Sequence, residues 1–167
     1  MSVWRDLFEG LTCGFLESGG LQRLRNNGVC YQERGRIERL TRENGWSIDG
    51  RTDDTIYLDF KSPFASDRRL LISRGDEALV IFSGMSFAEV PAHNFPQEVL
   101  GYLLERNAEM ALGAWNMQIT EEGKALCFCR YVAIGMGLNA GLFKYVCEGL
   151  NEEVHEFDVR MQKAGLL

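Results

Sequence analysis

The sequence predicts a single domain of the α+β class, in which helices pack on one antiparallel sheet. Three β-type runs separated by turn residues lie between positions 55 and 83. Two further alternating runs, 114–120 and 125–132, flank the turn Glu121-Glu122-Gly123. Helical periodicity precedes, separates and follows these two groups. The predicted order is therefore α-β-β-β-α-β-β-α, with a five-stranded sheet.

Length and charge limit the function before any motif is considered. The chain has 167 residues, a net charge of −6 and a pI near 5.0. A chain of this length can bury a core without a metal or a disulfide. Phosphate groups repel an acidic chain, so we expect neither nucleic-acid binding nor binding to an anionic membrane.

The cysteines indicate a reducing compartment. There are five of them, an odd number, and residues 1–17 resemble neither a secretory signal nor a membrane span because acidic residues interrupt them. Reduced thiols are typical of the cytoplasm, so we expect a cytoplasmic protein.

Residues 1–30 are predicted to be an N-terminal helical extension, and residues 31–167 the main domain. Apolar side chains recur at helical spacing near the start of the extension, and these are Val3, Trp4, Leu7, Phe8 and Leu11. Such a face can pack on the main domain, or it can dock on a partner or second subunit. Covering the molecule's own core is the more common role of an amphipathic helix.

The main domain is expected to begin with a helix over residues 33–44. Ile37 and Leu40 are its apolar anchors, and Gly45 is placed to end it. Arginines and glutamates alternate along it, which favours a solvated helix with local ion pairs over a nucleic-acid patch. Trp46 then leads the chain into the sheet as an expected core residue.

The first three strands are predicted at 55–60, 70–74 and 79–83. The third is apolar on both faces, so it is expected at the centre of the sheet. Residues 84–94 are expected to be a connection. Asn94 would cap a helix that continues to about residue 112, with Pro96 in its first turn.

The second hairpin and the last helix complete the domain. Trp115, Met117 and Ile119 alternate on one face of the first hairpin strand. On the second strand, Leu126, Phe128 and Val132 share one face, and Cys127, Cys129 and Tyr131 the other. Asn139 is a plausible cap for a helix over residues 140–162. Its apolar stripe consists of Phe143, Cys147, Leu150, Val154, Phe157 and Met161.

Two motifs could carry chemistry, and neither has the context it needs. Gly135-x-Gly137 follows a strand and precedes a helix, as a dinucleotide loop would, but no later strand completes a βαβ unit. Cys127-x-Cys129 lacks the spacing of a zinc knuckle, so buried thiols are the favoured interpretation. The paired carboxylates lie in turns or on a helix face, where water keeps their pKa ordinary. We predict no catalytic residues, cofactor or metal.

With these elements in place, the chain resembles the YbjN-like family, whose fold is that of the type III secretion (Tir) chaperones. The matching segments are Leu40-Thr-Arg-Glu-Asn-Gly-Trp46 before an acidic loop, Asp53-Asp54 before the first strand, Val90-Pro91, Leu103-Leu-Glu-Arg-Asn107 before Gly113, and the Glu121-Glu122-Gly123 hairpin. The resemblance covers about residues 37–162 and does not extend to residues 1–30.

The resemblance implies a non-enzymatic cytoplasmic protein that forms a homodimer and binds a segment of a partner protein. It suggests that the helix over 94–113 and the strand over 114–120 form the interface. The expected partner or dimer surface therefore consists of Leu103, Leu104, Trp115, Met117 and Ile119. The alternative is a regulatory domain that senses a small ligand in a groove between sheet and helices.

Overall fold

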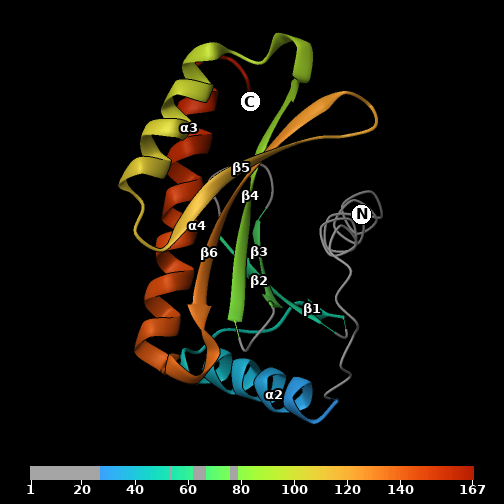
Figure 1. Ribbon diagram of the computed structural model, residues 1–167, viewed down its shortest axis with the longest axis vertical. Coiled ribbons are helices and arrows are strands. Elements are labelled where there is room, and N and C mark those ends of the chain that lie inside the picture. The colour runs from blue at the N-terminus through green and yellow to red at the C-terminus, as the bar shows by residue number, and fades with distance from the viewer. Residues whose placement is uncertain (1–26, 53, 62–66, 76–78) are drawn as a thin grey trace.

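The computed structural model describes residues 27–52, 54–61, 67–75 and 79–167. The predicted N-terminal extension lies outside the described residues up to position 26. The elements of the described chain are α2 (Asn27–Glu43), β1 (Gly50–Arg51), β2 (Thr55–Phe60), β3 (Arg68–Arg74), β4 (Leu79–Pro91), η1 (Ala92–Asn94), α3 (Gln97–Glu109), β5 (Gly113–Ile119), β6 (Lys124–Ile134), η2 (Gly135–Gly137) and α4 (Ala140–Lys163) (Figure 1).

The strands form one antiparallel sheet in the order β1-β2-β3-β4-β6-β5. The α+β class and the antiparallel pairing are confirmed, and β4 lies in the interior of the sheet as expected. Within the residues that the structure describes, the sheet has six strands rather than five. The additional strand, β1, pairs Gly50 with Tyr57 and Arg51 with Ile56. A strand of two residues is too short to show alternation of apolar and polar side chains, so the sequence pattern predicts a loop at Gly50 and Arg51.

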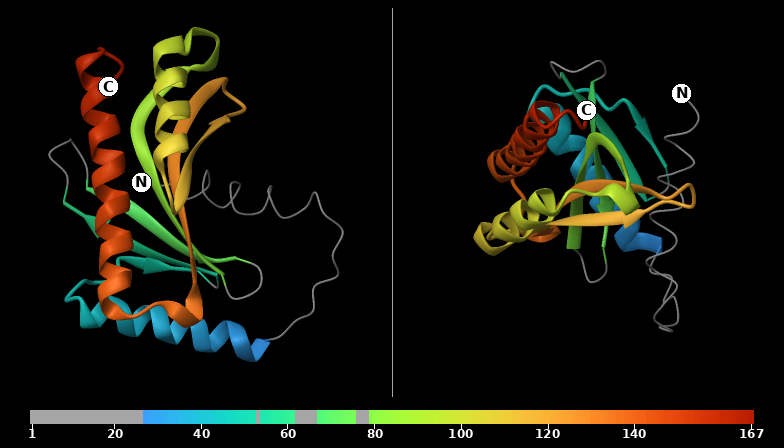
Figure 2. Two further views of the ribbon diagram at one scale, coloured as in Figure 1. Left: turned by 60° about the vertical axis from the view of Figure 1, so that its left-hand side comes forward. Right: turned by 90° about the horizontal axis from the view of Figure 1, so that it is seen from above.

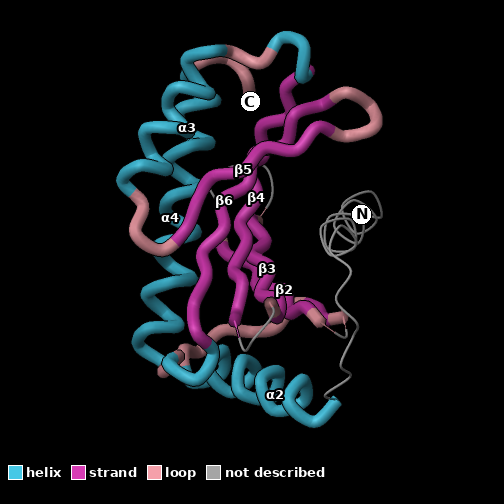
Figure 3. The backbone as a smooth tube through the Cα atoms, in the orientation of Figure 1, coloured by secondary structure: helices cyan, strands magenta, loops and turns pink. Residues whose placement is uncertain are grey.

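Strand β4 is much longer than predicted. It continues through Pro91, over residues that the sequence pattern assigns to a connection. Its pairing with β6 changes register between Met85 and Glu89, and this irregularity breaks the two-residue alternation. Figure 3 shows β4 and β6 as the long strands at the centre of the sheet.

Helices α3 and α4 cover one face of the sheet, and α2 crosses one end of it (Figures 1 and 2). The predicted apolar stripe of α4 is confirmed, because all six of its members are buried. They pack with Ile37 and Leu40 of α2 and with the helix-facing side chains of β2, β3 and β4. Phe143 lies at this junction, with ring centroids 5.9 Å from both Phe82 and Trp46. Trp46 is only half-buried.

The helix ends agree in part with the predicted caps. Gly45 has φ 72°, its N–H donates to the Arg42 carbonyl, and it ends α2 as expected. Asn139 caps α4 by accepting a hydrogen bond of 2.9 Å from the Leu142 N–H. Helix α3, in contrast, has Pro96 as its N-cap, because Asn94 belongs to the short 3₁₀ helix η1. Helix α2 begins at Asn27, before the predicted boundary between extension and domain.

A buried ion pair joins α4 to the sheet at the irregular part of β4. Arg68 of β3 donates to the carboxylate of Asp158, and both side chains are almost fully buried. The same carboxylate accepts hydrogen bonds from Ser86 Oγ at 2.5 Å and from the Phe87 N–H at 3.1 Å. Asp158 therefore satisfies backbone and side-chain donors where β4 leaves its regular register.

Candidate protein-binding surface

The structure divides the five predicted surface residues into two groups. Leu103 and Trp115 are buried within the subunit, with exposed fractions of 6% and 4%. Leu104, Met117 and Ile119 are exposed, with fractions of 70%, 41% and 58%. The expectation that Leu103 and Trp115 lie on the surface is therefore wrong, and the other three residues remain available to a partner.

Trp115 is buried because the C-terminal half of α4 lies over the start of β5. Its ring centroid is 4.5 Å from that of Phe157, and its Nε1 donates a hydrogen bond of 2.8 Å to Glu153. Met117 and Ile119 alternate on the same face of the strand, but they lie farther along the hairpin and are exposed. Strand parity groups the three residues correctly and cannot show where the covering helix ends.

Glu153 connects α3, α4 and β5 through one carboxylate. Arg106 of α3 donates to it from Nε at 3.1 Å and from a terminal nitrogen at 2.5 Å, and Trp115 is its third donor. Burial alone would raise the pKa of Glu153, but the bonds from Arg106 and Trp115 outweigh burial and lower that pKa. The network therefore holds α3 against the sheet with a charged carboxylate.

Strand β5 is the last strand of the sheet, so one of its edges has no neighbouring strand in the described chain. Part of that edge is covered by Asn107 of α3. Its Oδ1 accepts from the Trp115 N–H at 2.6 Å, and its Nδ2 donates to the Trp115 carbonyl at 3.1 Å. In an antiparallel pair, the backbone N–H and C=O groups of every second residue point away from the neighbouring strand. The N–H and C=O groups of Met117 and Ile119 therefore point outward at the same edge as those of Trp115. An edge of this kind can pair with another strand.

The exposed leucines of α3 lie beside this edge. Leu100, Leu104 and Asn107 are spaced by four and three residues, so they share one side of the helix. Asn107 reaches the outer edge of β5, which places Leu100 and Leu104 on the side of α3 that faces this edge. Helix α3 and strand β5 fold back on each other from the turn that joins them, so the exposed leucines and the exposed residues of β5 belong to adjoining elements. We call Leu100, Leu104, Met117 and Ile119 the edge surface.

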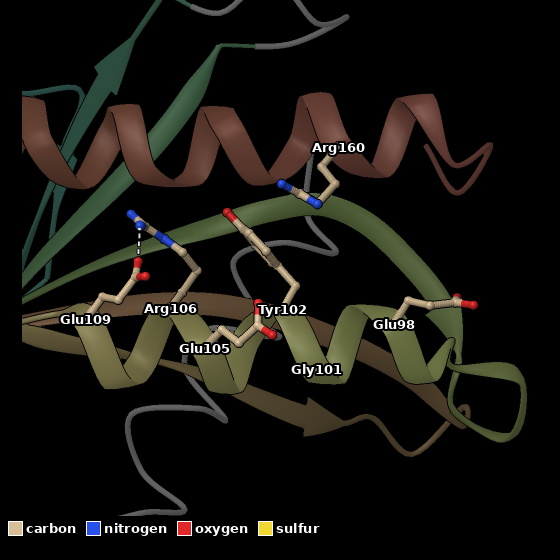
Figure 4. A pocket seen from close by; sticks show the side chains of 7 residues that line it. All are labelled: Glu98, Gly101, Tyr102, Glu105, Arg106, Glu109 and Arg160. Atoms are coloured by element: carbon tan, nitrogen blue, oxygen red, sulfur yellow. Dashed lines mark hydrogen bonds and ion pairs between the residues drawn. The ribbon is translucent and has the colours of Figure 1, made fainter.

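A separate polar groove lies on the α4 side of α3, with a volume of about 470 Å³. Figure 4 shows Tyr102 and Arg106 projecting from α3 toward α4, with Arg160 of α4 near the end of Tyr102. Arg160 lies over the Tyr102 ring, with its guanidinium carbon 4.2 Å from the centroid. The remaining lining residues are Glu98, Gly101, Glu105 and Glu109. This groove lies between two helices, whereas the ligand hypothesis places its groove between sheet and helices.

The other candidate motifs have structural roles. Cys127 and Cys129 are buried on the helix-facing side of β6, and burial raises the pKa of the Cys127 thiol to about 12. Gly135 and Gly137 form η2, which joins an antiparallel strand to α4. Among the residues that the structure describes, no group of three or more His, Cys, Asp or Glu side chains could hold a metal ion. No helix in the same part of the chain could span a membrane.

The sequence pattern places the Glu152-Glu153 pair on a solvated helix face, and this expectation is wrong for Glu153, which is buried and whose pKa is lowered by its partners. Sequence reasoning did not single out Glu153 or Asn107 as functional residues. Both are ordinary polar residues on helices, and their partners are 38 and 8 residues away along the chain. Apolar spacing indicates which side of a helix faces inward. It does not show which polar side chain at the margin of that side reaches a tryptophan nitrogen or a strand edge.

Comparison with known proteins places this geometry in a known fold. No protein-family model and no curated protein sequence matches the chain. The structure is similar to that of YbjN from E. coli, a protein named as a candidate transcription regulator, with a TM-score of 0.61, 13% identity, and 80% of this chain and 94% of that chain covered. It is also similar to a chain of the HopA1–SchA chaperone–effector complex, with a TM-score of 0.57, 14% identity, and coverage of 78% and 94%. The chain therefore has the YbjN-like, secretion chaperone-like fold.

Proposed function

We propose that this chain is a non-enzymatic, cytoplasmic protein-binding module that acts as a homodimer and binds a segment of a partner protein. The edge surface carries the proposal. It combines two exposed leucines on α3 with exposed Met117 and Ile119 on an outermost strand. Apolar side chains beside a strand edge are a usual setting for protein association. The likeness to a chain of a chaperone–effector complex supports a protein as the partner.

Homodimerisation would bring two edge surfaces together about a two-fold axis. The same patch would then serve both subunits, as is common in closed dimers. Trp115 is not a suitable position for this test, because its side chain is buried and a carboxylate placed there would destabilise the folded subunit itself. Leu104 is the better target, since its side chain is 70% exposed.

The experiment is size-exclusion chromatography with light scattering over a range of concentrations. We expect the mass of a dimer for the natural chain and of a monomer for Leu104→Glu, because a buried carboxylate at an apolar interface is strongly unfavourable. Leu142→Glu is the matched control, because Leu142 is also an exposed leucine on a helix but lies at the start of α4. A monomeric natural chain, or equal dissociation by both variants, would contradict the proposed interface.

Partner binding requires its own test. The natural chain is cross-linked in cells and purified together with any protein attached to it. The segment of that protein that carries the cross-link is then made as a peptide. That peptide should bind the purified chain in calorimetry with a defined stoichiometry. Failure of every recovered segment to bind would contradict the client role and leave the dimer result unaffected.

A ligand-sensing alternative would have to use the groove between α3 and α4, rather than the predicted groove between sheet and helices. Two guanidinium groups and one aromatic ring line it, together with three carboxylates. A melting temperature that rises with one small metabolite, and does not rise in Tyr102→Ala, would favour this alternative.

A further inference from the structure

The second face of the sheet carries an apolar cluster that the described helices leave uncovered. Leu71, Met85, Leu126 and Phe128 belong to β3, β4 and β6, and we call this set the open face. Met85 lies directly opposite Phe128 in the pairing of β4 with β6, and Leu126 is on the same side of β6. These residues alternate with Leu70, Gly84, Cys127 and Cys129, which face the helices.

The open face is buried although no helix of the described chain packs on it. All four side chains are at most 8% exposed. None of them belongs to the hydrophobic cluster that α2, α3 and α4 build with the sheet. Figures 1 and 2 show α3 and α4 together on the opposite face. Side chains of this kind are buried only where other atoms exclude water from them.

The part of the chain that precedes α2 has suitable length and chemistry. The sequence of residues 1–26 includes apolar residues at the spacing typical of a helix, and two of these, Trp4 and Phe8, are aromatic and suit contact with a methionine sulfur and a phenyl ring. Asp6 and Glu9 lie on the same stretch, and Arg130 supplies a cation beside Phe128, with 4.8 Å between guanidinium carbon and ring centroid.

The chain also enters α2 from the correct side. Figures 1 and 2 show the Asn27 end of α2 on the side of the sheet away from α3 and α4. Twenty-six residues span ~39 Å even as a continuous helix at ~1.5 Å per residue. That length is similar to the ~43 Å of a thirteen-residue strand such as β4. Covalent attachment keeps the segment at a high effective concentration near this face.

We propose that residues 1–26 dock on the open face of the same chain through Trp4 and Phe8, and so complete the burial of its four apolar side chains. The occupant is the chain's own segment, separate from the edge surface.

Methionine-methyl NMR on the full-length chain tests this directly. Met85 lies on the open face, and its signal can be assigned with Met85→Leu. Met117 and Met161 are on the other side of the sheet and serve as internal controls for folding. The variants are Trp4→Leu and Phe8→Leu, which remove an aromatic ring and keep an apolar side chain.

We expect each variant to move the Met85 methyl signal and to leave those of Met117 and Met161 in place. The Met85 signal of the natural chain should be independent of protein concentration. A Met85 signal that neither variant moves would overturn the proposal. A natural-chain signal that approaches the variant position on dilution would assign the covering segment to a second copy, and would overturn docking within the same chain.

Discussion

At the scale of single residues, two buried carboxylates have pKa values that are shifted in opposite directions. Glu153 accepts three hydrogen bonds from Arg106 and Trp115, and its pKa is lowered. Burial raises the pKa of Asp158, despite its hydrogen bond from Ser86 and the charge of Arg68. Both residues lie on α4. Glu153 joins this helix to β5, and Asp158 joins it to β4.

Glu153→Gln should destabilise the chain by about 2 kcal/mol at neutral pH, because it replaces charge-assisted hydrogen bonds with weaker ones. The folded-state pKa of Glu153 lies below its ordinary value of 4.5. Its stabilising effect is therefore complete above about pH 4.5 and is lost as the pH falls through the folded-state pKa. Urea unfolding from pH 7 to pH 3 should show the difference between the two chains shrinking. A difference that stays constant would exclude a role for the charge.

Arg68→Met should cost about 3–5 kcal/mol, because it leaves the Asp158 carboxylate buried without its cation. Protonation removes that charge, so the loss should decrease as the pH is lowered. The double variant Arg68→Met with Asp158→Asn should recover part of the stability, since it buries no charge and the amide oxygen can still accept from Ser86 and from the Phe87 N–H. Chemical denaturation of the three chains provides the measurement. Equal losses in single and double variants would show that packing, rather than the unpaired charge, determines the cost.

At the scale of elements, the contact between β5 and β6 depends on a residue without a side chain. A Cβ atom at Gly113 would lie 2.0 Å from the Arg130 carbonyl oxygen and 2.5 Å from the Tyr131 ring. Glycine therefore allows β5 to begin its pairing immediately after α3. That close approach also brings Asn107 to the Trp115 backbone.

Gly113→Ala should destabilise the chain by at least about 2 kcal/mol, since the backbone of β5 or β6 must shift. Gly101→Ala is the matched control, because it lies within α3 and nothing is within 4 Å of its added Cβ. The control should stabilise the chain by about 0.5–1 kcal/mol through helix propensity. Thermal unfolding of both variants distinguishes the two effects, and equal shifts of the same sign would contradict the steric argument.

At the scale of the whole molecule, two of the apolar surfaces on the described residues lie outside the core that α2, α3 and α4 form with the sheet. One is the edge surface, which is exposed in the subunit. The other is the open face, which is buried. The first is suited to association between subunits, and the second to a segment attached to the same subunit.

Association through the edge surface should make thermal stability depend on protein concentration. The melting temperature of the natural chain should rise with concentration, because a dimer of folded subunits is favoured by mass action. Leu104→Glu should melt at a temperature independent of concentration. Calorimetric scans over a hundred-fold range of concentration test this, and a concentration-independent natural chain would contradict dimer formation.

The sequence by itself determined the α+β class, the order of the main elements and most of the core. Period-two and helical spacing identified the two hairpin strands, the stripe of α4 and the caps Gly45 and Asn139, because these depend on neighbours within a few residues. The resemblance identified the fold correctly.

Only the tertiary structure decided which of the predicted surface residues are exposed. Trp115, Met117 and Ile119 have the same parity, but α4 covers the first and not the other two. The structure also revealed β1 and the extension of β4, since a short pairing and a register shift leave no periodic signal. Burial and pairing depend on segments far apart in the chain, and local spacing contains no information about where those segments meet.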